Sequence, residues 1–173
     1  MKVVSRQSIQ EFLERLGQRY PGSATLSLLG GSAMILLGSS RETMDIDYIG
    51  DDIHKNEFQI VIEKIASELG LETEAVSIGR FVPLPEGNEQ RRIHFGQYGN
   101  VNVYIIDPYS IALSKLDRGS DRDLDDLVFL THQNHITLEE LERVAHKGLA
   151  RAGKYDFHPE ILAHLEELKN HLK

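Results

Sequence analysis

The stretch LLGGSAMILLGSSRETMDIDY, residues 28–48, decides the predicted fold. It begins as an apolar strand, turns at Gly30 and Gly31, and then predicts a short apolar helix, a polar loop and a strand that carries Asp45 and Asp47. Residues i and i+2 of a strand face the same side. Both carboxylates are therefore expected to point into one space, while the residue between them points away.

The residue types of this stretch indicate its chemistry. Two converging carboxylates repel each other unless a cation lies between them, and Mg²⁺ or Mn²⁺, which accept oxygen ligands, are the expected cations. The glycines let the backbone approach a ligand closely, and a helix that begins near Ser32 favours a phosphate at its N-terminus. A phosphate site beside a metal site is typical of nucleotide binding.

The spacing of these residues resembles a known signature. Gly30, Gly31 and Ser32, followed after twelve residues by Asp45 and Asp47, resemble the motif of the DNA polymerase beta-like nucleotidyltransferase superfamily. The resemblance implies that the aspartates are catalytic and hold two divalent ions. It also implies that the Gly-Gly-Ser turn binds the phosphates of an NTP.

Two loop residues extend the resemblance. Arg41 and Thr43 complete an Arg-x-Thr-x-Asp-x-Asp pattern that is similar to the one in bacterial minimal nucleotidyltransferases and AbiEii-like toxins. The pattern implies that both residues contact phosphate or brace the loop. Arg41 is the stronger candidate because a guanidinium can bind a phosphate through two parallel hydrogen bonds. The likeness to toxins implies an antitoxin as a candidate partner.

A second charged segment, KLDRGSDRDLDD, begins at Lys115 and resembles a Lys…Arg…Arg-Asp-x-x-Asp segment of the same relatives. The resemblance implies that Lys115 is catalytic and that Arg118 binds the nucleotide. The residues alone leave a structural interpretation open. Acids at a helix start offset the helix dipole, and Asp126 can pair with Arg122 one turn earlier. Asp123 is predicted to be structural.

Active members of the superfamily carry a third carboxylate on a later strand. The matching strand is predicted at residues 99–105, where Asn102 takes the position and no acid is present. An amide oxygen can ligate a metal, so Asn102 is a candidate ligand, but it neutralises no charge and is a poor base. Three explanations stay open: the ion is held weakly, another acid serves, or the protein binds a nucleotide without turning it over.

The composition is that of an ordinary globular protein. Of the 173 residues, 40% are hydrophobic and 27% are charged, and the absence of Cys excludes disulfides and thiolate chemistry. Neither a signal peptide nor an apolar run of membrane-spanning length is present, so a cytoplasmic location and no membrane partner are expected. The net charge of −8 argues against a broad nucleic-acid surface but leaves room for a local basic patch.

The predicted fold class is α/β (α+β), with a nucleotidyltransferase-like mixed sheet, flanking helices and a helical C-terminal part. A soft boundary near Asp107 separates a sheet core at residues 1–106 from helices at 107–173, which form one domain or two. Asp107-Pro108 and His158-Pro159 predict helix starts, and Ser8 has capping-box spacing. Helices are predicted at 5–17, 33–37, 58–69, 111–116, 124–130, 138–149 and 161–172, and strands at 24–29, 44–49, 76–85, 92–95 and 101–106.

The predicted function is metal-dependent transfer of a nucleoside monophosphate from an NTP to an acceptor hydroxyl. The resemblance implies an RNA end, a protein or a small molecule as the acceptor. A different class stays open: a non-catalytic nucleotide- or partner-binding module, such as one component of a toxin–antitoxin pair. His94, on a predicted strand near the site, is a further candidate for contact with substrate.

Overall fold

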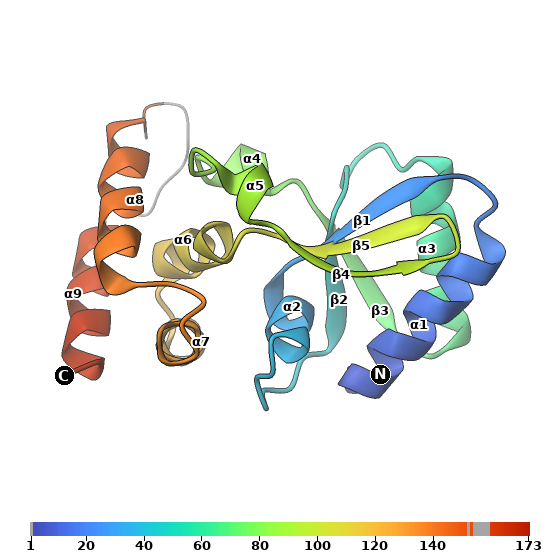
Figure 1. The fold of residues 1–173 in the computed structure, drawn as a ribbon, viewed down its shortest axis with the longest axis horizontal. Helices are drawn as coiled ribbons and strands as arrows, with labels where there is room; N and C mark the ends of the chain where they lie inside the picture. The colour runs from blue at the N-terminus through green and yellow to red at the C-terminus, as the bar shows by residue number, and fades with distance from the viewer. Residues whose placement is uncertain (1, 152, 154–159) are drawn as a thin grey trace. The chain divides into compact units, whose positions relative to one another are not determined.

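The computed structural model describes residues 2–151, 153 and 160–173. Figure 1 shows the chain, which forms two compact units. The sheet unit comprises Met1–Ser77 and Ile93–Ile106, and the helical unit comprises Ile78–Arg92 and Asp107–Lys173. The predicted domain boundary near Asp107 stays a prediction.

The sheet unit contains a five-stranded mixed sheet in the order β3-β2-β1-β5-β4. Strand β1 is antiparallel to β2 and parallel to β5, β2 is parallel to β3, and β4 is antiparallel to β5. This arrangement confirms the predicted α/β fold class with its mixed sheet. The strands are β1 Ala24–Leu28, β2 Asp45–Ile49, β3 Glu72–Val76, β4 Ile93–Tyr98 and β5 Val101–Ile105.

One side of this sheet is apolar and the other is polar. Alternation along the strands buries one set of side chains in the core, where α1 (Arg6–Arg19) and α3 (Glu57–Glu68) pack against each other and contact β4 and β3. The opposite side is called the polar face. The buried set is Leu26, Leu28, Ile46, Tyr48, Val101, Val103 and Ile105. The polar face carries Thr25, Ser27, Asp45, Asp47, Asn102 and Tyr104.

The first helix begins three residues earlier than its predicted capping box. Ser5 is the N-cap: its hydroxyl accepts a hydrogen bond from the backbone N–H of Ser8 at 3.1 Å, and the Ser8 hydroxyl accepts one from the Ser5 N–H at 2.8 Å. The predicted helix start at Ser5 is confirmed, but the capping box runs from Ser5 to Ser8 and does not begin at Ser8. An isolated bridge from Val4 to Thr43 holds the preceding backbone extended, so the helix starts directly after it.

The prediction was also wrong between residues 70 and 92. A strand was expected at 76–85, but β3 ends at Val76 and is followed by two short helices, α4 (Ile78–Phe81) and α5 (Asn88–Arg91). Strand β3 lies at the edge of the sheet, where Glu72 and Glu74 are exposed. These acids made the segment resemble a polar connection after α3 instead of a strand.

The helical unit contains four longer helices among its described residues: α6 (Pro108–Arg118), α7 (Asp121–His132), α8 (Leu138–Ala150) and α9 (Ile161–His171). The predicted start of α6 is confirmed, because Asp107 accepts a hydrogen bond from the Tyr109 N–H at 3.1 Å and Pro108 is the first helical residue. The predicted start at His158-Pro159 lies outside the described residues.

Asp107 is also bound by a cation from the other segment of the helical unit. The Arg91 guanidinium donates two hydrogen bonds to its carboxylate, at 2.9 and 2.8 Å. The bond to Asp107 is the main cause of a raised pKa of Arg91. Asp107 is buried, so this paired geometry supplies the partner that a carboxylate out of water requires.

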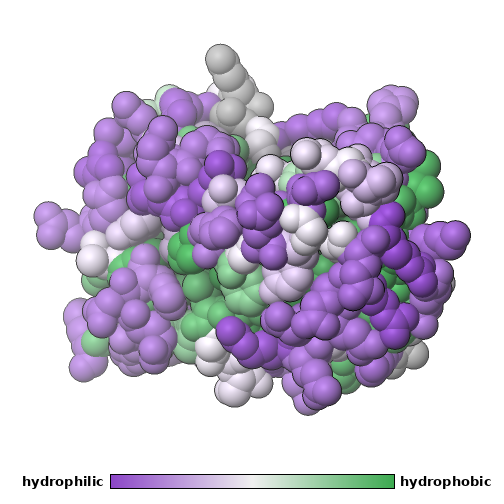
Figure 2. Space-filling model, turned by 45° about the vertical axis from the view of Figure 1, so that its right-hand side comes forward, coloured by the Kyte–Doolittle hydropathy of each residue, from purple (hydrophilic) through white to green (hydrophobic). Residues whose placement is uncertain are grey.

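The surface is mainly hydrophilic in the view of Figure 2, with hydrophobic side chains showing between polar ones. Such a surface agrees with a composition in which 27% of residues are charged. Among the described residues, no helix is both long and apolar enough to cross a membrane.

Candidate functional site

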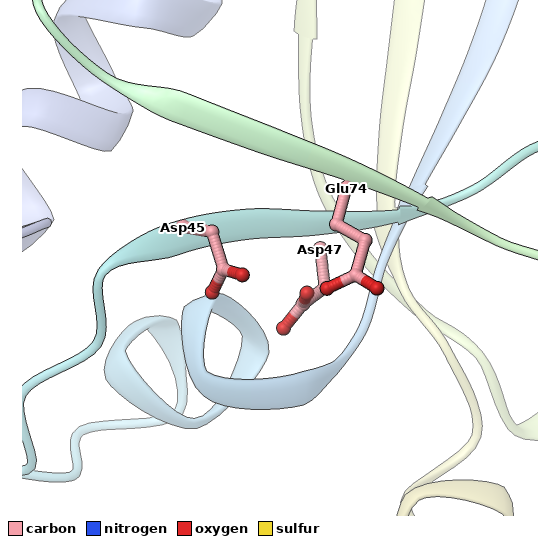
Figure 3. A group of neighbouring side chains, drawn as sticks. All are labelled: Asp45, Asp47 and Glu74. Carbon is pink, nitrogen blue, oxygen red and sulfur yellow. The ribbon is translucent and has the colours of Figure 1, made fainter. Parts of the chain in front are cut away.

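Three carboxylates meet on the polar face of the sheet unit. Asp45 and Asp47 extend from β2 and Glu74 extends from β3, and one oxygen of each lies within 4.8 Å of the others. The parallel register pairs Asp47 with Glu74, so the two side chains stand beside each other on the same face. Figure 3 shows all three carboxylates directed toward one region beside the first turn of α2. This group is called the acidic trio.

Gly30 allows that turn to lie against the trio. Its φ is +60°, a left-handed conformation that side chains rarely adopt, and a Cβ at this position would overlap the carboxylate of Asp47. Only glycine therefore satisfies both the turn and the position of Asp47. The motif residues Gly30 and Asp47, seventeen positions apart in the sequence, are in direct contact in the fold.

Gly31 is needed for a similar reason, because it lies against the side chain of Thr43. A Cβ on Gly31 would lie 2.5 Å from Thr43 Oγ1, so the absence of a side chain makes room for the threonine. Thr43 is 7% exposed, and its hydroxyl lies 3.4 Å from Asp45 Oδ1, in position to donate a hydrogen bond. The structure thus brings Thr43 to the trio, where it orients Asp45.

Ser32 lies in the first turn of α2 (Gly30–Leu36) and is fully buried. Its hydroxyl lies 3.0 Å from the carbonyl oxygen of Leu29 and 3.3 Å from that of Asp47, and donates its hydrogen bond to these acceptors. Ser32 therefore ties the start of the helix to strand β2. Its predicted contact with phosphate stays a prediction.

Arg41 lies in the loop before β2 and is partly exposed. Its backbone N–H donates to the Ser39 hydroxyl at 3.2 Å, and its Nε lies 3.5 Å from the Glu42 carbonyl oxygen. The loop is thus organised by its own backbone and side chains. The predicted phosphate contact of Arg41 stays a prediction.

The structure does not place Asn102 beside the aspartates. Asn102 is on β5, and β1 lies between β5 and β2. Two strand spacings, about 9.6 Å across the sheet, separate β5 from β2. Asn102 pairs with Thr25, so it also lies two rows further along the sheet than Asp47. The Asn102 amide oxygen instead lies 3.4 Å from His94 Nε2 on β4.

Glu74 is the site residue that sequence reasoning missed. The family resemblance placed the third carboxylate on the strand at 99–105, and no strand was predicted at residues 72–75. A signal was present: a crossover helix must be followed by a strand, and Glu72-Thr-Glu74-Ala alternates directly after the glycine that ends the helix.

Lys115 and Arg118 lie in the helical unit and have carboxylate partners there. Lys115 is 2% exposed, and its Nζ lies 2.6 Å from Asp126 and 3.7 Å from Asp123. Arg118 donates to Asp123 at 2.6 and 3.2 Å, and 58% of its side chain is exposed. These four residues are called the α6–α7 charge cluster. Their predicted catalytic and nucleotide-binding roles stay predictions.

Of two further predictions for this charged segment, one is wrong and one is confirmed. The suggested pairing of Asp126 with Arg122 is wrong, because Asp126 turns to the buried Lys115 of the neighbouring helix. The structural role of Asp123 is confirmed: it is the N3 residue of a capping box with Ser120. Burial raises the pKa of Asp123, but hydrogen bonds from Arg118 and Ser120, with the charges of Arg118 and Lys115, outweigh burial and lower the pKa overall.

The acidic trio fits a divalent cation. Three carboxylates within 4.8 Å of one another offer the hard oxygen ligands that Mg²⁺ and Mn²⁺ accept, and none of the three residues is fully buried, so an ion can reach them. The left-handed turn at Gly30 lets the backbone lie against the trio. The arrangement can therefore hold a cation together with an anionic ligand that shares it.

A mixed sheet with paired aspartates beside a Gly-Gly turn defines a nucleotidyltransferase-like protein. The model of the family described as "Nucleotidyltransferase of unknown function (DUF6036)" matches residues 7–164, which is most of the chain. The chain therefore belongs to this family, which confirms the predicted nucleotidyltransferase membership. The finer likeness to AbiEii-like toxins stays a prediction. Neither the curated proteins nor the solved structures contain a match to the chain.

Proposed function

We propose that this protein is a metal-dependent nucleotidyltransferase that transfers a nucleoside monophosphate from an NTP to an acceptor hydroxyl. The observation that carries the proposal is the acidic trio against the Gly30 turn in a chain of a nucleotidyltransferase family. The use of Mg²⁺ or Mn²⁺, the acceptor and a cytoplasmic location are parts of this proposal.

The reaction forms one bond to the α-phosphorus of the NTP and breaks another. The acceptor oxygen forms a bond to the α-phosphorus, the bond from that phosphorus to the bridging oxygen breaks, pyrophosphate leaves, and the hydroxyl proton passes to a base. A divalent cation bound by Asp45, Asp47 and Glu74 would neutralise phosphate charge and favour the departure of pyrophosphate. The three carboxylates would hold the ion, and the Thr43 hydroxyl, 3.4 Å from Asp45 Oδ1, would help to orient Asp45.

The remaining candidate residues differ in how directly they can act. The turn at Gly30 and Gly31 and the first backbone amides of α2 would accept the phosphates, while the Ser32 hydroxyl holds that turn in place. Arg41 is proposed to contact phosphate from the loop before β2. Arg118 is exposed and so open to an anionic ligand, whereas Lys115 is held in a buried ion pair with Asp126.

The proposal is tested by transfer of label from each of four α-labelled NTPs in Mg²⁺ or Mn²⁺. The acceptors are total tRNA, cell lysate and the protein itself. Asp47→Asn removes one ligand of the trio, and Asp125→Asn, at an exposed position on α7, is the matched control. We expect label that depends on metal, disappears in Asp47→Asn and persists in Asp125→Asn.

The labelled species would identify the acceptor as RNA, protein or small molecule. Absence of label with all acceptors, while metal-dependent NTP binding persists, would contradict catalysis. That result would favour the alternative of a nucleotide- or partner-binding module, including a toxin–antitoxin component. Equal transfer by Asp47→Asn would contradict the assignment of the trio.

A further inference from the structure

The polar face continues beyond the acidic trio into a region of different chemistry. A hollow of about 420 Å³ lies over the ends of β1, β5 and β4 and is lined by Ser23, Ala24, Thr25, Gln97, Asn100 and Asn102. None of these residues is charged, although 27% of the chain is. Sites for phosphate are built from Arg, Lys and backbone amides, so an uncharged lining of amides and hydroxyls favours a neutral, hydrogen-bonding ligand.

The strand register arranges the lining in rows. Thr25 pairs with Asn102 across β1 and β5, and Asn102 pairs with Gln97 across β5 and β4, so these three side chains stand together on the polar face. Each amide carries both donors and an acceptor, which is the combination that the edge of a nucleobase presents.

The next row toward the trio is aromatic. Tyr104 on β5 pairs with His94 on β4, and their rings meet edge to face with centroids 5.1 Å apart. His94 is exposed and also contacts the Asn102 amide, so the ring pair adjoins the uncharged hollow. Aromatic side chains on an exposed sheet face are a common platform on which nucleobases stack.

The ring pair lies at a distance from the trio that a nucleotide can span. Tyr104 is two strands away from Asp47 and one row further along the sheet, because β1 lies between β2 and β5 and Tyr104 pairs with Ser27. These offsets amount to roughly 12 Å between the two backbones. Phosphates held at the trio and a base held at Tyr104 can therefore belong to one ligand or to two adjacent nucleotides.

We propose that His94 and Tyr104, together with the amides of Asn102 and Gln97, form a nucleobase-binding subsite on the polar face. This inference rests on the proposed function and gives it a substrate class, because a base at this place belongs to the incoming NTP or to a nucleic-acid acceptor. Two sources thus share one chemistry, and the experiment separates them.

The test measures binding without metal and without catalysis. Adenosine, cytidine, guanosine and uridine are titrated into the full chain, with ribose as the base-free probe, and the side-chain amide signals of Asn102 and Gln97 are followed by NMR. We expect at least one nucleoside to shift these signals and ribose to leave them unchanged. Equal shifts with ribose, or no shift with any nucleoside, would overturn the proposal.

Variants distinguish stacking from general polarity. Tyr104→Ala is expected to weaken nucleoside binding about tenfold, the loss of one stacking partner, whereas Tyr104→Phe keeps the ring and the affinity. Gln97→Ala, at an exposed position, should also weaken binding, and Gln7→Ala on the exposed side of α1 should not. Unchanged affinity in both Tyr104→Ala and Gln97→Ala would contradict the subsite.

The transfer assay then identifies the source of the base. If the NTP supplies it, Gln97→Ala changes the ratio of kcat/KM among the four NTPs; if the acceptor supplies it, that ratio is constant and the KM for the acceptor rises. Both results support the subsite. Because nucleoside binding is measured apart from transfer, a protein that binds bases but transfers no label contradicts the proposed function and leaves the subsite standing.

Discussion

Two clusters of charged side chains in this protein show how the same residue types serve different ends. In the acidic trio, three carboxylates converge at positions that solvent can reach. In the α6–α7 charge cluster, Asp123 accepts a hydrogen bond from Arg118 and Asp126 accepts one from Lys115. Lys115 is buried together with both carboxylates. Like charges that converge indicate a place for a ligand, whereas opposite charges that pair in the interior hold helices together.

The largest effect is expected from removing the cation of the buried cluster. Lys115→Met would leave Asp126 buried without its ion-pair partner, and we expect the free energy of unfolding to fall by about 3–5 kcal/mol. Lys147→Met, at an exposed lysine on α8, should change it by less than about 0.5 kcal/mol. Urea titration followed by circular dichroism measures both. If Lys115→Met lowered the free energy of unfolding by less than about 1 kcal/mol, the buried cluster would not have the structural role that distinguishes it from the acidic trio.

The next effect separates backbone strain from site geometry. Gly30 and Gly70 have similar φ values, +60° and +70°, but a Cβ at Gly70 meets nothing within 4 Å, whereas one at Gly30 overlaps the Asp47 carboxylate. Both Ala variants should lose about 1–2 kcal/mol of stability from the left-handed backbone. Only Gly30→Ala should also lose Mn²⁺ affinity, measured by calorimetry. Equal Mn²⁺ binding in the two variants would contradict the contact between turn and trio.

A smaller effect is expected on how the free energy of unfolding depends on pH. The pKa of Asp123 is lowered in the folded state, so its contribution to stability is fully present above the unfolded pKa of about 3.9 and is lost as the pH falls through the folded pKa. The difference in unfolding free energy between the wild type and Asp123→Asn should therefore shrink as the pH falls below about 4. Denaturant titrations from pH 7 to the acid limit measure it. A constant difference would contradict a lowered pKa.

The smallest effect is expected at Asn102. Strand β1 separates it from the aspartates, so Asn102→Ala should leave Mn²⁺ affinity unchanged within error. A clear loss of Mn²⁺ binding in this variant would show that Asn102 does take part in the metal site, as the sequence alone suggested.

The part of the site that is local in sequence could be predicted. The glycine turn and the aspartate strand lie within twenty residues, and their spacing alone indicated a turn, a helix and two carboxylates on one face. The mixed sheet was predicted from the order of strands and helices along the chain. The parts that depend on packing could not be predicted. Glu74 joins the trio from edge strand β3, and the acids of this segment are not typical of a strand.

The surroundings of Lys115 likewise could not be predicted from the sequence. The resemblance of its segment implied a place near phosphates for Lys115, but here its Nζ lies 2.6 Å from Asp126, eleven residues further along the chain. Whether a lysine meets a ligand or a neighbouring helix depends on how the helices pack, and spacing within one segment does not report it. The motif therefore predicted the cluster of charges but not its burial.

The most direct test of the central claim compares Glu74→Gln with Glu72→Gln. Both glutamates are exposed on the same side of β3, but only Glu74 belongs to the acidic trio. Mn²⁺ affinity and metal-dependent NMP transfer are measured in each variant. The account predicts that Glu74→Gln loses both, with transfer reduced at least about 100-fold, while Glu72→Gln stays close to the wild type. Equal behaviour of the two variants would contradict a three-carboxylate metal site in this member of a nucleotidyltransferase family.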